Sequence, residues 1–231
     1  MTYVIFSVVS ISNKKLIGAA FLVLVVFAAV SVVIMVWWTT TVDKSDYVQV
    51  EIREYEGKDL SSISAFRENS IKGPQQIDIT DYRLNVTGLV NKNLTYEYDE
   101  IVNSFPLQKK VITLHCVEGW RVTIFWEGFL VEDLIETADV DPNATTVIFY
   151  AHDGYSTALP LDFIIDKNIM IAYKMNNVTL PPERGFPFQL VAESKLGYKW
   201  IKWLISIELS DNEGYLGTWE RQGYPNAADV R

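Results

Sequence analysis

Cys116 has the most distinctive chemistry in this chain, because it is the single cysteine among 231 residues. It stands in the string Leu-His-Cys-Val-Glu-Gly-Trp-Arg at 114–121, and the run 110–114 has the composition of a buried strand. A lone cysteine cannot form an internal disulfide. A thiol at a strand end, followed by a Glu-Gly turn and an aromatic residue, is expected to point into a cleft. The alternative is a small buried apolar side chain.

The elements that must position this cysteine are predicted to be mostly strands. Runs rich in β-branched and aromatic residues, which are typical of strands, occupy 82–89, 111–116, 122–126 and 146–150. Residues 130–137 have the apolar spacing of a helix, and residues 71–74 are expected to form a loop. The alternation at 196–209 predicts a long strand or a pair of strands. The predicted fold class is therefore α+β and strand-rich.

The first part of the chain has the pattern of a membrane anchor. Residues 16–38 carry no charge and no proline, and as a helix they would extend about 35 Å, enough for a hydrocarbon core of about 30 Å. Lys14 and Lys15 precede this stretch, so the positive-inside rule predicts a cytoplasmic N-terminus at 1–15 and an extracytoplasmic domain. The polar residues 39–59 are expected to form a tether. A cleaved signal peptide is the alternative.

Composition restricts the class of protein and its partners. An apolar content of 49% excludes a disordered chain. A formal charge of −9 argues against nucleic acid as a partner, because no basic stripe is present. Four Asn-x-Thr triplets, which begin at 85, 93, 143 and 177, support export to a compartment with glycosylation.

Five further strings accompany the cysteine string in a fixed order. They lie at 81–90, 126–128, 153–161, 180–187 and 197–203. Together with the cysteine string they resemble the sulfite-oxidase-like molybdopterin-dependent oxidoreductases, a family that includes bacterial methionine-sulfoxide reductases. The resemblance implies that residues 60–231 form a single molybdopterin-binding domain of the sulfite oxidase type, preceded here by one predicted transmembrane helix.

The resemblance also implies a cofactor, molybdenum-molybdopterin, with Cys116 as the protein ligand of the metal. The dithiolene group of the pterin supplies two more sulfurs, so one protein thiolate is sufficient, whereas a structural zinc site needs several protein ligands. Binding to the metal would remove the thiol proton.

The phosphate of this cofactor requires fixed cations or backbone donors. Lys199 and Lys202 stand three residues apart in the segment where the family binds the pterin, although a solvated strand face is the alternative. The resemblance adds weaker candidates for cofactor contact, which are Asn69, Lys72, His152 and Arg184.

Three residues are predicted to act on the substrate. Tyr155 aligns with the active-site tyrosine of sulfite oxidases, whose phenol can donate a hydrogen bond to a substrate oxygen. A tyrosine that caps the turn at 153–154 is the alternative. Arg67 and Arg121 are the candidates for binding an anionic substrate.

The predicted function is a membrane-anchored oxidoreductase that transfers an oxygen atom and two electrons on a small sulfur-containing substrate, sulfite or a sulfoxide. The chain has no haem-attachment string and no nucleotide fingerprint, so a separate electron-transfer partner is expected, a membrane cytochrome or a soluble carrier. Gln189 stands where the family usually has arginine, and a neutral amide cannot replace a bidentate phosphate contact. A cofactor-free binding or scaffold protein that keeps the fold is therefore the alternative.

Overall fold

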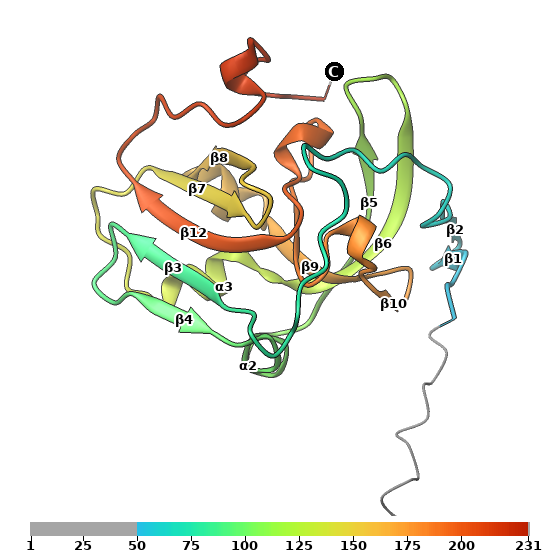
Figure 1. Ribbon diagram of the computed structural model, residues 1–231, viewed down its shortest axis with the longest axis horizontal. Coiled ribbons are helices and arrows are strands. Elements are labelled where there is room, and N and C mark those ends of the chain that lie inside the picture. The colour runs from blue at the N-terminus through green and yellow to red at the C-terminus, as the bar shows by residue number, and fades with distance from the viewer. Residues whose placement is uncertain (1–49, 231) are drawn as a thin grey trace, which may run out of the picture. The chain divides into compact units, whose positions relative to one another are not determined.

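The computed structural model describes residues 50–230, which form two five-stranded sheets and a short hairpin (Figure 1). The hairpin pairs β1 (Glu54–Tyr55) with β2 (Lys58–Asp59). Residues 60–83 follow without a helix or strand. Apolar side chains from both five-stranded sheets pack into one core.

The first five-stranded sheet is antiparallel and has the order β10-β9-β6-β5, with β11 also paired to β9. Its strands are β5 (Gln108–His115), β6 (Arg121–Leu130), β9 (Met170–Met175), β10 (Val178–Thr179) and β11 (Gln189–Val191). Strand β6 is buried along most of its length. Gly128 lets β9 approach closely, because a Cβ atom at this position would lie 1.9 Å from the carbonyl oxygen of Ile171.

The second five-stranded sheet is mixed and has the order β4-β3-β12-β7-β8. Its strands are β3 (Leu84–Gly88), β4 (Leu94–Tyr96), β7 (Thr146–Ala151), β8 (Ser156–Pro160) and β12 (Leu204–Ser210). Strand β12 is parallel to β3 and antiparallel to β7. Because β12 begins immediately after Trp203, this sheet fixes the position of residues 197–203.

Short helices connect the strands. They are α2 (Tyr98–Ser104), α3 (Val131–Glu136), α4 (Leu161–Asp166) and the 3₁₀ turns η1 (Pro182–Arg184), η2 (Gly197–Lys199) and η3 (Glu220–Gln222). Helix α3 buries Val131, Leu134 and Ile135, so the helical spacing at 130–137 was a correct signal. The four strands predicted within 82–150 are confirmed as β3, β5, β6 and β7.

The prediction for residues 196–209 is wrong for its first half. Only Leu204–Ser210 is a strand, whereas Gly197–Lys199 is a 3₁₀ turn. Trp203 has a φ of +52°, a left-handed conformation that a β-strand cannot contain. The aromatic and basic residues before β12 therefore lie on a folded loop and do not alternate across a sheet.

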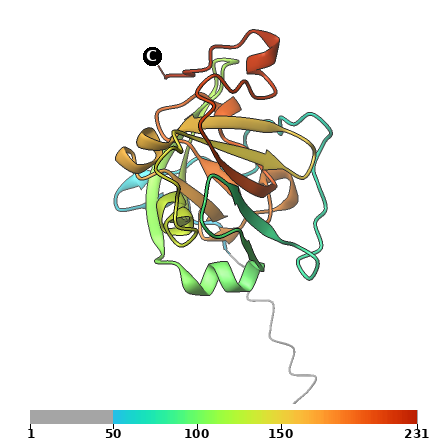
Figure 2. The same ribbon diagram turned by 90° about the vertical axis from the view of Figure 1, so that its left-hand side faces the viewer.

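The connection between β5 and β6 and the C-terminal segment after β12 lie at the same end of the domain, as both views show (Figures 1 and 2). Residues from both segments line one cavity.

The predicted N-terminal segments 1–15 and 16–38 lie outside the described residues. Among residues 50–230, no helix is long and apolar enough to cross a membrane. The predicted tether 39–59 is described from residue 50, and this part packs on the domain. The ring of Tyr55 stacks on Phe125 at 3.9 Å between centroids, and Glu51 accepts a 2.8 Å hydrogen bond from the amide of Ile63.

Candidate functional site

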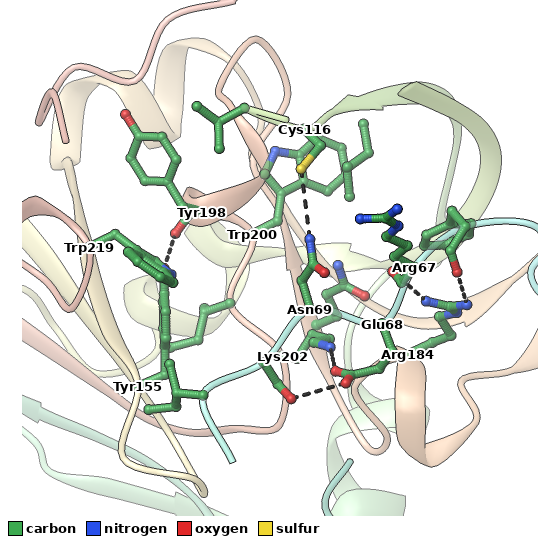
Figure 3. A pocket seen from close by; sticks show the side chains of 18 of the residues that line it. Arg67, Glu68, Asn69, Cys116, Tyr155, Arg184, Tyr198, Trp200, Lys202 and Trp219 are labelled. Atoms are coloured by element: carbon green, nitrogen blue, oxygen red, sulfur yellow. Dashed lines mark hydrogen bonds and ion pairs between the residues drawn. The ribbon is translucent and has the colours of Figure 1, made fainter. Parts of the chain in front are cut away.

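A cavity of about 360 Å³ opens where six segments distant in sequence meet (Figure 3). The segments are residues 66–71, the β5–β6 hairpin, residues 153–155, residues 184–189, residues 197–203 and the C-terminal segment. The cavity is lined by Trp120, Trp126, Trp200, Trp203 and Trp219, which are all the tryptophans between residues 50 and 230. A large part of its wall is therefore aromatic.

Cys116 lies in this cavity, directly after the end of β5. A tight turn positions it, because its amide donates to the carbonyl of Trp120 at 2.9 Å and its carbonyl accepts from Gly119 at 3.0 Å. Gly119 has a φ of +93°, which glycine adopts without strain. Strand alternation holds to the end of β5, since Leu114 and Cys116 line the cavity and His115 does not.

The thiol of Cys116 is half-buried and has one side-chain partner, the amide of Asn69, at 3.8 Å from Nδ2 to Sγ (Figure 3). Burial raises its pKa above the ordinary value, and the amide hydrogen bond from Glu118 opposes that effect only in part. The sulfur is therefore protonated at neutral pH unless a cation binds it.

Arg184 also lines the cavity, at the end of η1, and is 7% exposed. Its Nε donates to the carbonyl of Ile63 at 2.8 Å. The two terminal nitrogens donate to the carbonyls of Phe66 and Arg67, at 2.7 and 3.2 Å. Burial lowers the pKa of Arg184 from its ordinary value. This guanidinium holds the irregular segment 63–67 against the cavity.

Lys202 and Arg67 complete the cationic part of the lining. Lys202 forms an ion pair with Glu68, and its Nζ lies 4.4 Å from the ring centroid of Trp203. Arg67 is exposed. Hydrogen bonds from Trp120 and Asn69, together with the charge of Arg67, lower the pKa of the Glu118 carboxyl.

Tyr155 lines the cavity and also takes part in a turn. Its backbone amide donates to Oδ1 of Asp153 at 3.0 Å. Its hydroxyl donates to the carbonyl of Tyr198 at 2.6 Å. Burial raises the pKa of the phenol well above its ordinary value, with Glu220 contributing. The phenol proton is therefore used in this hydrogen bond to the backbone and is not free for a ligand.

Lys199 does not line the cavity, although it stands only three residues from Lys202. Its side chain is fully buried, and its Nζ forms an ion pair with Glu220. The same nitrogen donates to the carbonyl of Ala158 at 3.0 Å and to Oδ1 of Asn226 at 2.9 Å. All three ammonium protons thus have protein partners, and the side chain joins β8 to the C-terminal segment.

Lys72, Arg121 and His152 are likewise outside the lining, and all three are exposed. Arg121 begins β6 and pairs with His115 across the hairpin. The Nδ1 atom of His152 lies 3.2 Å from Oε1 of Gln75. The structure brings Arg67, Asn69, Cys116, Tyr155, Arg184 and Lys202 together and leaves these three apart from them.

Three acidic residues of the lining, Glu68, Glu118 and Asp153, were not among the predicted site residues. Asp153 is 2% exposed and Glu68 pairs with Lys202. Glu68 stands between Arg67 and Asn69, so its place in that string was the available signal. The tryptophan walls had a signal too, because seven tryptophans in 231 residues is a high content.

The lining residues fit a molybdopterin group. A single thiol offers a soft metal ligand, and the guanidinium and ammonium groups are of the type that binds phosphate. The cavity volume of about 360 Å³ is within the usual range of about 300–1,000 Å³ for small-molecule sites. Gln189, buried in the lining at 5% exposure, is an additional hydrogen-bonding group.

Comparisons with known proteins identify the family of this chain. Residues 71–219 match the family model described as the oxidoreductase molybdopterin binding domain. The oxidoreductase YuiH of Bacillus subtilis (strain 168) is 36% identical over 157 residues, which cover 68% of this chain and 78% of YuiH. The protein-methionine-sulfoxide reductase catalytic subunit MsrP of Gluconobacter oxydans (strain 621H) is 31% identical over 157 residues, 61% of this chain and 50% of MsrP.

A solved structure has the same fold. The sulfane dehydrogenase SoxCD from Paracoccus pantotrophus superposes with a TM-score of 0.57 at 22% identity, covering 60% of this chain and 40% of the SoxCD chain. The chain thus spans half of MsrP and less than half of the SoxCD chain. Since the family match extends over most of the folded domain and includes Cys116, this chain belongs to the oxidoreductase molybdopterin binding domain family and is an oxidoreductase of the sulfite-oxidase-like group.

Proposed function

We propose that this protein is a molybdenum-molybdopterin oxidoreductase that transfers an oxygen atom and two electrons at the sulfur of a small substrate, sulfite or a sulfoxide. The observation that carries the proposal is the position of Cys116, the single cysteine, in a cavity that also contains three cationic side chains. The bound group would supply the two-electron redox centre, for which a soft thiolate is a suitable protein ligand.

The side chains around Cys116 have separate tasks in this proposal. Lys202 provides positive charge for the cofactor phosphate, and Arg184 fixes the segment that covers it. Arg67, exposed at the mouth, is available to hold a polar oxygen of the substrate. Tyr155 limits the position of the substrate by van der Waals contact, because its hydroxyl proton is donated to the carbonyl of Tyr198. The tryptophan walls exclude water.

The two candidate reactions differ in the direction of electron flow. Oxidation of sulfite takes an oxygen atom from water and yields sulfate, two protons and two electrons. Reduction of a sulfoxide consumes two protons and two electrons and yields a thioether and water. The name of the relative MsrP supports the second reaction, and so does the acidic Glu118 beside Arg67, which weakens the site for a dianion.

The proposal includes an electron-transfer partner and a membrane location. The sequence contains no haem-attachment string and no nucleotide fingerprint, so electrons pass to or from a separate protein. The uncharged stretch 16–38, with Lys14 and Lys15 before it, supports a single-pass anchor and an extracytoplasmic domain. Membrane fractionation of cells that express the full chain, followed by protease treatment of intact cells, tests both features.

The first experiment measures metal and pterin content. The full chain is made in a host with the molybdenum pathway, as wild type, as Cys116→Ser and as His115→Ser. Equimolar molybdenum and pterin are expected in wild type and in His115→Ser, whose side chain is outside the cavity lining. In Cys116→Ser the metal is expected to be lost or its absorption spectrum changed, because a hydroxyl replaces a soft thiolate poorly.

Either of two results would contradict the proposal. A folded wild-type protein that carries neither metal nor pterin would support a scaffold role. An unchanged spectrum in Cys116→Ser would remove the cysteine from the metal site.

If wild-type protein carries the cofactor, two assays decide the direction of electron flow. One uses sulfite with an oxidised dye as electron acceptor. The other uses a sulfoxide with a reduced dye as electron donor.

A further inference from the structure

Residues 63–68 form a strap that contributes to the cavity wall and contacts Arg184 and Lys202. It belongs to the irregular stretch between β2 and β3, and Phe66, Arg67 and Glu68 within it line the cavity. Neither a helix nor a sheet holds it in place. Glu51 accepts from the amide of Ile63 at its start, and two side chains of the cavity lining, Arg184 and Lys202, hold the rest of it (Figure 3).

Arg184 attaches the strap through its backbone. Three guanidinium hydrogen bonds end on the carbonyls of Ile63, Phe66 and Arg67, and the guanidinium carbon lies 3.8 Å from the ring centroid of Phe66. These contacts do not depend on the identity of the strap side chains, apart from Phe66. Arg184 therefore acts as a fixed attachment point for the strap.

Lys202 attaches the strap through a side chain. Its ammonium group contacts the carboxylate of Glu68 and lies 3.3 Å from the carbonyl of Glu183. The side chains of Lys202 and Glu68 are only 14% and 24% exposed. A largely buried ammonium is destabilised when it has no counter-ion, so an anion beside Lys202 is strongly favoured.

The cofactor requires the same cation. Molybdopterin has a phosphate group, and Lys202 is the cavity lysine available to it. A carboxylate that remains on Lys202 would repel an incoming phosphate. Asp153 also contributes negative charge near Lys202, which makes a further anion less favourable there.

We infer that Glu68 is an internal counter-ion which occupies Lys202 in place of the cofactor phosphate, and that cofactor loading exchanges the carboxylate for the phosphate. In this exchange Arg184 keeps the backbone of the strap attached while the Glu68 side chain turns away. No covalent bond forms or breaks. The inference rests on molybdopterin binding and is independent of the substrate.

Cofactor uptake by apoprotein tests the inference. The full chain is purified from a host that cannot make pterin, and it is titrated with molybdopterin released from a loaded donor protein. Bound pterin is measured by fluorescence after gel filtration and oxidation. Glu68→Gln keeps the size of the side chain and removes its charge, so uptake is expected at about three- to tenfold lower cofactor concentration than in wild type.

Three variants provide the controls. Lys202→Met should weaken uptake at least about tenfold, and in the Lys202→Met background Glu68→Gln should have no effect, because the competition needs both partners. Glu183→Gln removes one nearby exposed carboxylate that is not in the cavity lining, and it should leave uptake unchanged. The affinity of each apoprotein for inorganic phosphate, measured by calorimetry, should rank the variants in the same order.

Weaker uptake in Glu68→Gln would overturn the inference, since it would mean that Glu68 binds the pterin or positions Lys202 for it. A Glu68→Gln effect that persists in the Lys202→Met background would also overturn it. If wild type and every variant fail to take up pterin, the proposed function itself fails. Normal uptake in wild type with no gain in Glu68→Gln removes only this inference.

Discussion

Lys199 and Lys202 show how far two similar residues can differ in environment. Both are lysines of the same loop, yet Lys202 faces the cavity and Lys199 is fully buried against Glu220. Burial lowers the pKa of both ammonium groups, and the acidic partner of each opposes that effect. The partner of Lys199 lies in the C-terminal segment, so this lysine stabilises the fold around the cavity.

The buried pair leads to a prediction about stability. Glu220→Gln leaves the Lys199 charge without its counter-ion and is expected to reduce the free energy of unfolding by about 3–5 kcal/mol. The double variant Lys199→Met with Glu220→Leu should recover part of that loss, because no unpaired charge remains buried. Urea unfolding of the three proteins measures the differences.

Pterin content separates a stabilising role for Lys199 from the predicted cofactor contact. The folded fraction of the double variant should carry as much pterin per chain as wild type. A folded double variant that carries no pterin would support the predicted contact between Lys199 and the cofactor.

The candidate site could be predicted in outline because its residues stand in recognisable strings. Cys116 was identified from its place at the end of a strand, and Arg184 and Lys202 from strings that resemble the family. Lys199 was grouped with Lys202 because spacing along the sequence says nothing about a loop that turns at Gly197–Lys199 and again at Trp203. The pairing of Glu68 with Lys202 spans 134 positions, and no local pattern contains it.

Among the elements, the tight turn between β9 and β10 has a role beyond joining two strands. Its first residue, Asn176, is fully buried, and its Oδ1 accepts from the amide of Phe125 at 3.0 Å. Its Nδ2 donates to the carbonyl of Ser61 at 2.8 Å and to Glu51 at 3.1 Å. One side chain thus ties the start of the described chain to the central strand β6.

Replacing this asparagine tests its role. Asn176→Ala leaves several buried polar groups unpaired and is expected to cost about 2–4 kcal/mol of unfolding free energy, measured in urea. Asn177→Ala is the matched control, because Asn177 also has a positive φ, +67°, but is exposed. The control should cost about 1 kcal/mol, from backbone strain and the loss of a long, exposed hydrogen bond to the carbonyl of Val50. Equal losses in both variants would contradict a special role for the buried amide.

Glu51, in the same group of contacts, predicts a pH dependence. Burial acts to raise its pKa, but hydrogen bonds from the Ile63 amide, Asn176 and Ser62 outweigh burial and hold the pKa below its ordinary value of 4.5. A carboxyl whose pKa is lower in the folded state stabilises the fold above the ordinary value, and this contribution disappears as the pH falls through the folded value.

Glu51→Gln should therefore be less stable than wild type at neutral pH, and the difference should shrink in acid. Urea unfolding at about pH 7 and about pH 3 measures it. Glu54→Gln, an exposed change in the neighbouring strand β1, should alter stability little at either pH. A difference for Glu51→Gln that grows on acidification would contradict the assignment.

The strands were predictable because β-branched and aromatic residues mark them locally, as β6 and β7 illustrate. Residues 50–59 were expected to belong to a polar tether. Their packing on the domain through Tyr55 and Glu51 was not predicted. Their charged composition indicated a solvated segment, although two specific contacts hold it. These are the stacking of Tyr55 on Phe125 and the hydrogen bonds of Glu51. Such contacts depend on which distant residues the sheets bring near, and composition alone does not contain that information.

For the whole molecule, the cavity depends on complete folding. Its lining runs from Phe66 to Tyr224 and includes residues of β5, β6 and β11 in the first sheet and of the connections next to β7, β8 and β12 in the second. No single segment can form it, so a ligand binds the folded state and has no site in the unfolded chain. Binding then adds directly to the stability of the domain.

This dependence predicts a difference between loaded and cofactor-free protein. At a cofactor concentration about 100 times the dissociation constant the gain is about 2.7 kcal/mol, which corresponds to a rise of roughly 5–10 °C in unfolding temperature for a domain of this size. Differential scanning calorimetry of the two forms, each with one transition, measures it. Cys116→Ser should show a smaller rise, and an equal rise would mean that the thiol contributes nothing to retention.

The tryptophans give the domain an optical property. Every tryptophan between residues 50 and 230 lines the cavity, so the ultraviolet emission of the folded domain originates at its walls. A bound pterin absorbs in the near ultraviolet and would lie within a few ångströms of several indoles, a separation at which excitation energy passes almost completely to the acceptor. Trp37 and Trp38 are outside the described residues and add a background that Trp37→Phe and Trp38→Phe remove. The chain thus carries its own fluorescent indicator of an occupied cavity, and a stopped-flow trace of its dimming would time the arrival of the cofactor without any attached dye.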